Sequence, residues 1–260
     1  MENNLYFGKG SKMLTRLEIK IEKKEDICLN SMSLFQGVIM EKIDREYGDF
    51  LHLSKLKPYT QSLSIKEDYI LWQISTLYDE ARKKIIVPLY LDDFNEIELK
   101  YNGIKLRVLN KEIIETSEQE LMDKYYFGES KRFVKINFTT PTSFKSNGKY
   151  QIYPDLKWIY QSIMKKHDEV SDETIVFNEE VLEDLVNYSE IVSYNLKSTT
   201  FQLEGVKIPS FKGRITIKVR GPQMLVNLVS FMIAYAEFSG VGIKTSIGMG
   251  SIKFENGGSQ

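Results

Sequence analysis

Two histidines, His52 and His167, are the side chains in this sequence whose ordinary pKa suits proton transfer near neutral pH. His52 is followed by Lys57, with Lys55 nearer to it, and a lysine beside a proton-transfer group can neutralise a reacting anion. Residue types alone leave two interpretations for each position. His52 is either a catalytic group or an ordinary surface histidine, and Lys57 is either a site cation or a solvated lysine.

His167 has a weaker case. It follows two lysines at the end of an expected helix, where positive charge is favoured by the helix dipole, and we interpret it as a solvated residue near the helix end. No Cys/His cluster or carboxylate pair has the spacing of a metal site. The sequence therefore predicts neither a metal ion nor a cofactor.

Residues 237–252, EFSGVGIKTSIGMGSI, form a glycine-rich stretch between an expected helix and an expected strand. Its four glycines are Gly240, Gly242, Gly248 and Gly250. Glycines allow positive φ and can expose backbone N–H groups to a phosphate, although such a connection is also common as a plain tight turn. The enclosed Lys244-Thr245-Ser246 step is misplaced for a P-loop, and a dinucleotide fingerprint would lead from a strand into a helix.

Positive charge is concentrated near the C-terminus although the formal net charge is only −1. Residues 196–254 hold eight Lys/Arg against two acids, Glu204 and Glu237. The eight are Lys197, Lys207, Lys212, Arg214, Lys218, Arg220, Lys244 and Lys253. This excess predicts a phosphate-facing surface, and a solvated face of an antiparallel sheet is the alternative.

The 260 residues are enough for two domains, and 42% apolar composition can fill two cores. The single cysteine, Cys28, excludes an internal disulfide and fits the cytoplasm. The longest apolar run, residues 224–236, is interrupted by Asn227 and Ser230, so no membrane partner is expected. Residues 1–12 are interpreted as a tag or disordered tail before Met13.

The periodicity of the first half predicts strand, helix, strand, strand, helix, strand. The strand is 14–22; the helix begins after Ser31 and stops at Gly48, with a loop over 49–58; strands follow at 60–65 and 69–77. A helix over 79–86 and strand character up to residue 114, turning at Tyr101-Asn102-Gly103, complete the unit. A helix over 117–126 would lead to a boundary at Gly128.

The same order recurs in the second half. The expected elements are a strand at 132–139, helices at 155–167 and 178–188, strands at 190–204 and 206–220 with Gly205 at their turn, a helix at 223–238 and a strand at 250–254. We therefore predict an α+β protein of two tandem ferredoxin-like (RRM-like) domains, each an antiparallel sheet with helices on one face. The domains would span 13–128 and 129–255.

The glycine-rich stretch resembles the C-terminal signature of the CRISPR-associated endoribonucleases that process repeat RNA. That signature is a helix, glycine–hydrophobic–glycine, Lys-Thr-Ser and a second glycine–hydrophobic–glycine. Three further stretches, at 133–145, 153–164 and 196–215, resemble members found beside type III-A systems. The likeness covers nearly all of 13–254.

The resemblance implies an enzyme that cuts precursor CRISPR RNA once per repeat without a metal ion. In such a reaction the 2′-hydroxyl attacks the neighbouring phosphorus and leaves 2′,3′-cyclic phosphate and 5′-hydroxyl ends. The products would be guide RNAs for an antiviral effector complex. The implied partner is CRISPR repeat RNA; a transient contact with a type III effector complex and a homodimer stay open.

The segment 50–62, FLHLSKLKPYTQS, resembles the family's catalytic segment, in which a histidine and then a lysine precede an aromatic-Thr-x-Ser step. His52 and Lys57 match these positions. Archaeal members carry a tyrosine in the first helix where this chain has Met40, which leaves Tyr47 or Tyr59 to supply a hydroxyl unless the pair suffices. Both tyrosines are also natural packing residues.

Two other functions remain open. A ferredoxin-like protein of the same repeat-associated superfamily could hold the RNA without cutting it, although a pure scaffold has no reason to keep His52 followed by Lys57. A ferredoxin-like enzyme acting on a small phosphorylated metabolite could use the glycine-rich loop as an anion cradle.

Overall fold

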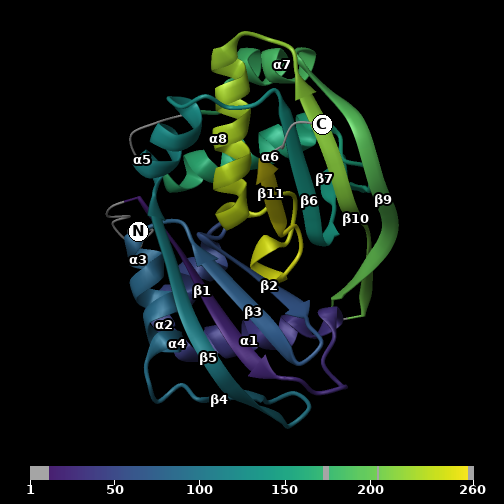
Figure 1. Ribbon diagram of the computed structural model, residues 1–260. Helices are drawn as coiled ribbons and strands as arrows, with labels where there is room; N and C mark the ends of the chain where they lie inside the picture. Colours follow the sequence, from purple (N-terminus) through teal and green to yellow (C-terminus); the bar gives the residue numbers. More distant parts are fainter. Residues whose placement is uncertain (1–11, 172–175, 204, 257–260) are drawn as a thin grey trace, which may run out of the picture.

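The computed structural model describes residues 12–171, 176–203 and 205–256, which form two large antiparallel sheets with helices packed against them and a separate two-stranded hairpin (Figure 1). The first sheet has the strand order β2-β3-β1-β5-β4 and the second β11-β6-β10-β9. The first unit, built around the first sheet, comprises β1 (Met13–Glu22), α1 (Met32–Lys42), α2 (Arg45–Leu53), β2 (Tyr59–Ile65), β3 (Tyr69–Thr76), α3 (Asp79–Ala81), a π-helical stretch (Arg82–Ile86), α4 (Val87–Tyr90), β4 (Glu96–Leu99) and β5 (Ile104–Ser117).

A short connection leads into the second unit: α5 (Glu118–Leu121) and a π-helical turn (Met122–Tyr126). The second unit comprises β6 (Phe133–Thr142), the hairpin β7 (Phe144–Ser146) and β8 (Lys149–Gln151), α6 (Leu156–Val170), α7 (Glu179–Asn187), β9 (Ser189–Leu203), β10 (Val206–Val219), α8 (Gln223–Ser239), a 3₁₀ turn (Thr245–Ile247) and β11 (Ile252–Asn256).

Both sheets have ferredoxin-like connectivity. In each, the first strand of the unit lies between the third and the last, and the second strand lies outside the third. The first unit adds β4 as an extra edge strand beside β5. The predicted fold class is therefore confirmed. The proposed division at residue 128 separates the strands of one sheet from those of the other in sequence.

Alternation of apolar and polar residues explains the strands. Leu17, Ile19 and Ile21 of β1 are fully buried, and the residues between them are partly exposed. Ile215 and Ile217 do the same in β10, where they pack in the second core with α6 and α8. Each sheet thus presents a polar face on the side away from its helices.

The prediction of one helix between Ser31 and Gly48 is wrong, because this segment forms two helices, α1 and α2. Ile43 has extended backbone, and the Asp44 carboxylate accepts the Tyr47 N–H at 2.8 Å, which caps a new helix. Gly48 is consequently buried inside α2 and is not a helix stop. The expected loop at 49–58 is helical up to Leu53.

The two cores interlock. Leu14 and Tyr78 of the first unit belong to the core of the second. In return, Phe201 and Ile208 of the long β9–β10 ribbon and Met249 of the glycine-rich loop belong to the core of the first. Figure 1 shows the ribbon reaching from the second sheet to the first unit. The relative position of the units is therefore fixed by buried apolar surface.

The expectation of a solvated His167 is wrong. Its side chain is buried; Nε2 lies 3.2 Å from Glu118 Oε1 and Nδ1 lies 3.2 Å from Asp168 Oδ1. The ring also packs edge-on against Tyr235 of α8, 5.3 Å between centroids. The expected helix at 155–167 is present but continues to Val170, and the sequence could not show that α8 covers this end of α6. His167 joins α6 to α5 and is not available to a substrate.

Lys166 is buried beside it. Its ammonium donates hydrogen bonds to the carbonyls of Ser239 (3.2 Å) and Gly240 (3.1 Å), the last turn of α8. Those carbonyls have no partner within the helix, so the ammonium caps α8 where the glycine-rich loop begins. Burial lowers the pKa of Lys166 to about 7.

Among the described residues, no helix combines the length and the apolar composition needed to cross a membrane. The most apolar helix, α8, has 17 residues and is covered on most sides by the second unit. Its apolar character therefore reflects burial in the core.

We predict that the free energy of unfolding rises with pH through Lys166. Unfolded lysine titrates near pH 10.4, so between about pH 7 and pH 10 the unfolded chain binds one proton more than the folded chain. The expected contribution is about 1.4 kcal/mol per pH unit. Urea titrations of wild type and Lys166→Met at several pH values would show this rise in the difference between them. Parallel pH profiles would contradict a buried, neutralised lysine.

Candidate functional site

His52 lies in the last turn of α2 and is exposed to solvent. Its position follows from the helix restart at Asp44, because a straight continuation of α1 would not direct residues 45–53 along the same path. Leu51, in the preceding position, is buried and anchors this turn in the first core. The imidazole is therefore presented to solvent from a packed helix end.

Lys57 is held by that same helix end. Its ammonium donates to the carbonyl of Ser54 at 2.6 Å and to the carbonyl of Leu51. The two carbonyls bracket His52, so Lys57 closes the C-terminus of α2 and fixes the turn that carries the histidine. Partial burial, and then the nearby ammonium of Lys244, lower the pKa of Lys57.

The two candidate tyrosines are buried. Tyr47 packs in the first core with its ring 5.5 Å from that of Phe50, and burial, with Tyr78 next, raises its pKa far above the ordinary value. Burial also raises the pKa of Tyr59, to about 12, against hydrogen bonds with Gln36 and Ser246 that lower it. Neither hydroxyl is exposed beside His52 as a third proton-transfer group. Met40, in α1, brings no hydroxyl either.

The glycine-rich loop does not present its glycine N–H groups to solvent. All four donate within the protein: Gly240 to Ala236 O (2.9 Å), Gly242 to Ser162 Oγ (2.8 Å), Gly248 to Thr245 O (3.3 Å) and Gly250 to Pro141 O (3.0 Å). All four glycines have positive φ, which explains why the loop needs them. The loop is thus a tightly folded turn, and its glycines are used for conformation.

This loop is seated on the first unit. The Gln61 amide of β2 donates to Ser246 O at 2.8 Å, and the Trp72 indole of β3 holds that amide by donating to its Oε1 at 2.9 Å. Thr60 Oγ1 donates to Phe238 O at 2.8 Å just before the loop. Thr245 and Ser246 are buried in the contact. The loop therefore lies against β2, the strand that begins two residues after Lys57.

Lys244 is the part of the loop that faces outward. It is exposed, and it lies near enough to Lys57 for its charge to lower that residue's pKa. It also has a left-handed backbone, φ 58° and ψ 31°, which is uncommon for a residue with a side chain. The structure thus brings Lys244, from the other domain, near Lys57, which caps the helix end that carries His52.

The basic strands form a second cationic surface. Lys207 and Arg214 of β10 are exposed, and Lys212 is half-buried opposite Lys197 of β9. Burial, and then the charge of Lys197, lower the pKa of Lys212. Two lysines placed side by side across strands repel each other, so this pair is suited to an anion lying over both.

Two further candidates, Lys218 on β10 and Arg220 directly after it, are engaged with other side chains of the protein. The Lys218 ammonium lies 5.4 Å from the centre of the Phe133 ring. Arg220 donates from Nε to Glu190 Oε1 at 3.0 Å, and its Nη2 contacts the same oxygen. The exposed ion pair of Arg220 is weak, and a phosphate could replace Glu190 in it. Because Lys218 and Arg220 already have partners within the protein, we rank both behind Lys212 and Arg214 in this surface.

A narrow polar groove lies where the two units meet. It is lined by the outer faces of β1, β2 and β3, with Arg16 and Gln73, and by Glu237, Ser251 and Lys253 of the second unit. Its free volume of 30 Å³ is too small for a nucleotide. Burial raises the pKa of Glu237, although the Phe254 N–H and Arg16 act in the opposite direction.

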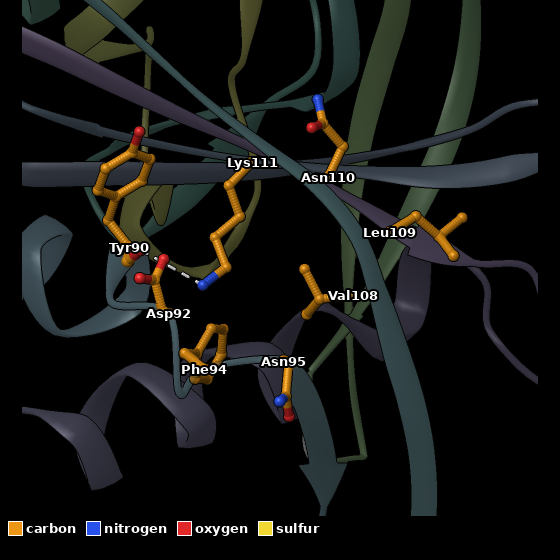
Figure 2. Close-up of a pocket in the computed structure, with 8 residues that line it drawn as sticks. All are labelled: Tyr90, Asp92, Phe94, Asn95, Val108, Leu109, Asn110 and Lys111. Atoms are coloured by element: carbon orange, nitrogen blue, oxygen red, sulfur yellow. Dashed lines mark hydrogen bonds between the residues drawn. The ribbon is translucent and has the colours of Figure 1, made fainter.

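A larger hollow of 310 Å³ lies in the first unit, between the α4–β4 connection and β5 (Figure 2). Lys111 points into it, and its ammonium donates to the carbonyls of Leu91 (2.5 Å) and Tyr90 (3.4 Å). Phe94 forms part of the floor, and none of the sequence-predicted site residues lines it. With its cation already bonded to the backbone, this hollow offers no proton-transfer pair.

Within the described ranges, no group of three His, Cys, Asp or Glu side chains is arranged to hold a metal ion. The lysines and the single exposed histidine are therefore the groups on which a chemical role can be built.

Comparison with known proteins identifies the family. Residues 136–252 match the family model "CRISPR-associated endoribonuclease Cas6". A curated relative of that name from Streptococcus thermophilus is 34% identical over 222 residues, 85% of this chain and 90% of that one. This chain belongs to the Cas6 family.

Two further similarities agree. A Cas6 from Mycobacterium tuberculosis is 30% identical over 224 residues, 84% of this chain and 70% of that one. A solved structure of a Cas6 product complex has a TM-score of 0.78 and 21% identity, covering 94% of this chain and 99% of that one. The predicted family and its endoribonuclease class are confirmed, and the solved structure supports the fold. The type III-A assignment remains a prediction.

Sequence reasoning missed two parts of this Cas6-family site. Lys197 was counted only as a charge, although the register that pairs Val206 with Leu203 places it opposite Lys212. The Gln61–Trp72 pair that receives the loop had no sequence signal, because a buried amide and indole look like ordinary strand residues.

We predict that Gly242→Ala destabilises the protein rather than acting only on a ligand. A Cβ at this position would lie 2.3 Å from Ser143 O, on a residue whose φ is +81°. We expect the free energy of unfolding to fall by about 2 kcal/mol or more. Gly37→Ala is the control, because Gly37 lies in α1 with no atom within 4 Å of a new Cβ; it should be neutral or stabilising by up to about 1 kcal/mol. Equal urea midpoints for the two variants would refute the packed loop.

Proposed function

We propose that this Cas6-family endoribonuclease cleaves CRISPR repeat RNA at a site centred on His52, by attack of a 2′-hydroxyl on the adjacent phosphorus. The observation that carries the assignment is the contrast between its two histidines. His52 is exposed at the helix end that Lys57 caps, whereas His167 is buried between two carboxylates. Only the first can reach an RNA backbone.

In this reaction the 2′-oxygen bonds to phosphorus while the bond from phosphorus to the 5′-oxygen breaks. The 2′-hydroxyl loses a proton and the departing 5′-oxygen gains one, which gives a 2′,3′-cyclic phosphate and a 5′-hydroxyl. His52 transfers a proton at one of these oxygens. A lysine ammonium neutralises the charge that develops on the phosphorane. Imidazole and ammonium together supply both functions, so the proposed reaction requires no metal ion.

Binding and cutting use neighbouring surfaces. Lys212 and Arg214, with Lys207, Lys218 and Lys197 around them, are proposed to hold RNA phosphates on β9 and β10. The products are proposed to serve in the cytoplasm as guide RNAs for an antiviral effector complex. A transient contact with a type III effector complex and pairing of two copies are further associations of this proposal, which co-purification and sedimentation would test.

We expect His52→Ala to slow single-turnover cleavage by about 10²–10⁴-fold, the usual effect of losing a general acid or base. Affinity for the RNA should change only a few-fold, because one exposed imidazole adds little to binding. The assay uses labelled repeat RNA from the organism's own array, in EDTA, and Leu53→Ala, an exposed neighbour in the same turn, as control.

A 2′-deoxy substitution at the cut nucleotide should stop the reaction in wild type. Cleavage by His52→Ala at the wild-type rate would exclude His52. Tight RNA binding by wild type without any cut would favour the alternative, a repeat-RNA scaffold.

Charge reversal at Lys212 or Arg214 should weaken RNA binding. Each should also reduce the slope of log affinity against log salt by about 0.7–0.9, the value for one lost phosphate contact. At saturating protein the cleavage rate should largely recover, because these residues position the RNA. Lys100→Glu, on the β4–β5 turn of the first unit, is the control and should leave the slope unchanged. Wild-type slopes in the Lys212 and Arg214 variants would remove this surface from the proposal.

A further inference from the structure

Lys244 is the one residue of the glycine-rich loop that has a positive φ and is not a glycine. The loop meets its other left-handed positions with glycines, but position 244 carries a long side chain at φ 58°. A non-glycine residue in this region is disfavoured by about 1 kcal/mol or more, and such outliers cluster at functional sites. Glycine would satisfy the backbone here, so the lysine side chain itself needs an explanation.

The backbone of Lys244 is held rigidly. Its carbonyl accepts the N–H groups of Ile247 (3.0 Å) and Met249 (3.2 Å), and the Ile243 N–H donates to Ser143 O at 3.0 Å. Two residues further on, Ser246 is bonded to Gln61 of the first domain. The side chain therefore leaves a fixed turn at the junction of the two domains.

The same junction carries Lys57. Ser246 also bonds to the Tyr59 hydroxyl, two residues after Lys57, so the loop places Lys244 next to the segment that carries Lys57. Lys57 uses two of its three N–H groups on carbonyls of α2. Lys244, among the residues that the structure describes, has no hydrogen bond or ion pair to an acceptor. Two ammonium groups without an anion repel each other, and an anion bound between them would reverse that repulsion.

These observations separate the roles of the two lysines. Lys57 is a positioning residue, since its ammonium fixes the turn of α2 that presents His52. Lys244 is the cation with free donors, and it reaches the site from the second domain. This division also explains the loop's tight packing: an electrostatic group is effective when it is held in place before the substrate arrives.

We propose that Lys244 is a catalytic residue, which contacts the non-bridging oxygens of the scissile phosphate and stabilises the phosphorane, so that the active site is shared between the two domains. This inference rests on the proposed function and adds to it a catalytic residue, Lys244, and the phosphate that this residue contacts. The ligand is one phosphodiester of single RNA strand, bound between His52 and Lys244.

The first test is Lys244→Gly, because glycine keeps the left-handed backbone and removes only the side chain. Thermal stability should be unchanged or higher. Single-turnover cleavage at saturating protein should fall by about 10²-fold, the order found for one donor to a developing anion. Lys244→Arg should recover part of the rate. Lys57→Ala, in contrast, should lower both the rate and the melting temperature.

The second test needs no cleavage. RNA with a neutral methylphosphonate in place of the scissile phosphate, and a 2′-deoxy nucleotide before it, should bind wild type more weakly by about three- to tenfold. It should bind Lys244→Gly no more weakly than the charged RNA does, because the contact is already lost. A methylphosphonate several nucleotides away from the scissile phosphate should lower the RNA affinity of wild type and of Lys244→Gly by the same factor.

Each outcome has a consequence. A wild-type rate for Lys244→Gly at saturating protein, or additive effects of the variant and the scissile methylphosphonate, would overturn the inference while leaving the proposed function intact. Absence of cleavage by wild type itself would overturn the proposed function, and the binding cycle would then decide separately whether Lys244 contacts that phosphate.

Discussion

The hydrogen bond from the Gln61 amide to the Ser246 carbonyl is the contact on which the position of the glycine-rich loop, and with it the candidate site, depends. It is buried, and the Trp72 indole fixes the amide by occupying its oxygen. A buried amide that lost its partner would be strongly unfavourable, so the chain is held to one register of loop on strand. Met249 and the β9–β10 ribbon add apolar surface to the same contact. The two ferredoxin-like domains therefore behave as one framework at the candidate site.

This framework concentrates positive charge in a protein whose net charge is −1. Lys244 lies near Lys57 at the domain junction, and Lys197 lies opposite Lys212 on the neighbouring strand. Such pairs reduce stability in the free protein, as the lowered pKa values of Lys57 and Lys212, already depressed by burial, indicate. The folded state tolerates them because the cores are large and interlocked. An RNA backbone, with one negative charge per nucleotide, is a partner that relieves both repulsions at once.

The glycine-rich loop shows how a family signature can have a structural cause. Its positive-φ glycines allow a turn so tight that a Cβ at Gly250 would lie 1.9 Å from Val241 O. Lys166 holds the start of the loop by capping α8, and Gln61 holds its middle by a hydrogen bond to the Ser246 carbonyl. Only Lys244 is left facing outward. The signature therefore encodes a rigid turn that fixes the position of the Lys244 side chain, and not a set of exposed backbone amides that bind a phosphate.

The sequence by itself determined the fold class, because strand alternation such as Leu17, Ile19 and Ile21 and the helix signals around Asp155 and Pro222 are local properties. It also singled out His52 and the glycine-rich loop. What it could not determine was which polar groups are covered. His167 and Lys166 have the composition of a solvated helix end, yet α8 buries both. The meeting of Lys244 with Lys57 joins residues almost 190 positions apart. Such proximity depends on how two separately encoded cores pack together, and that packing is decided by tertiary contacts for which no short segment carries a signal.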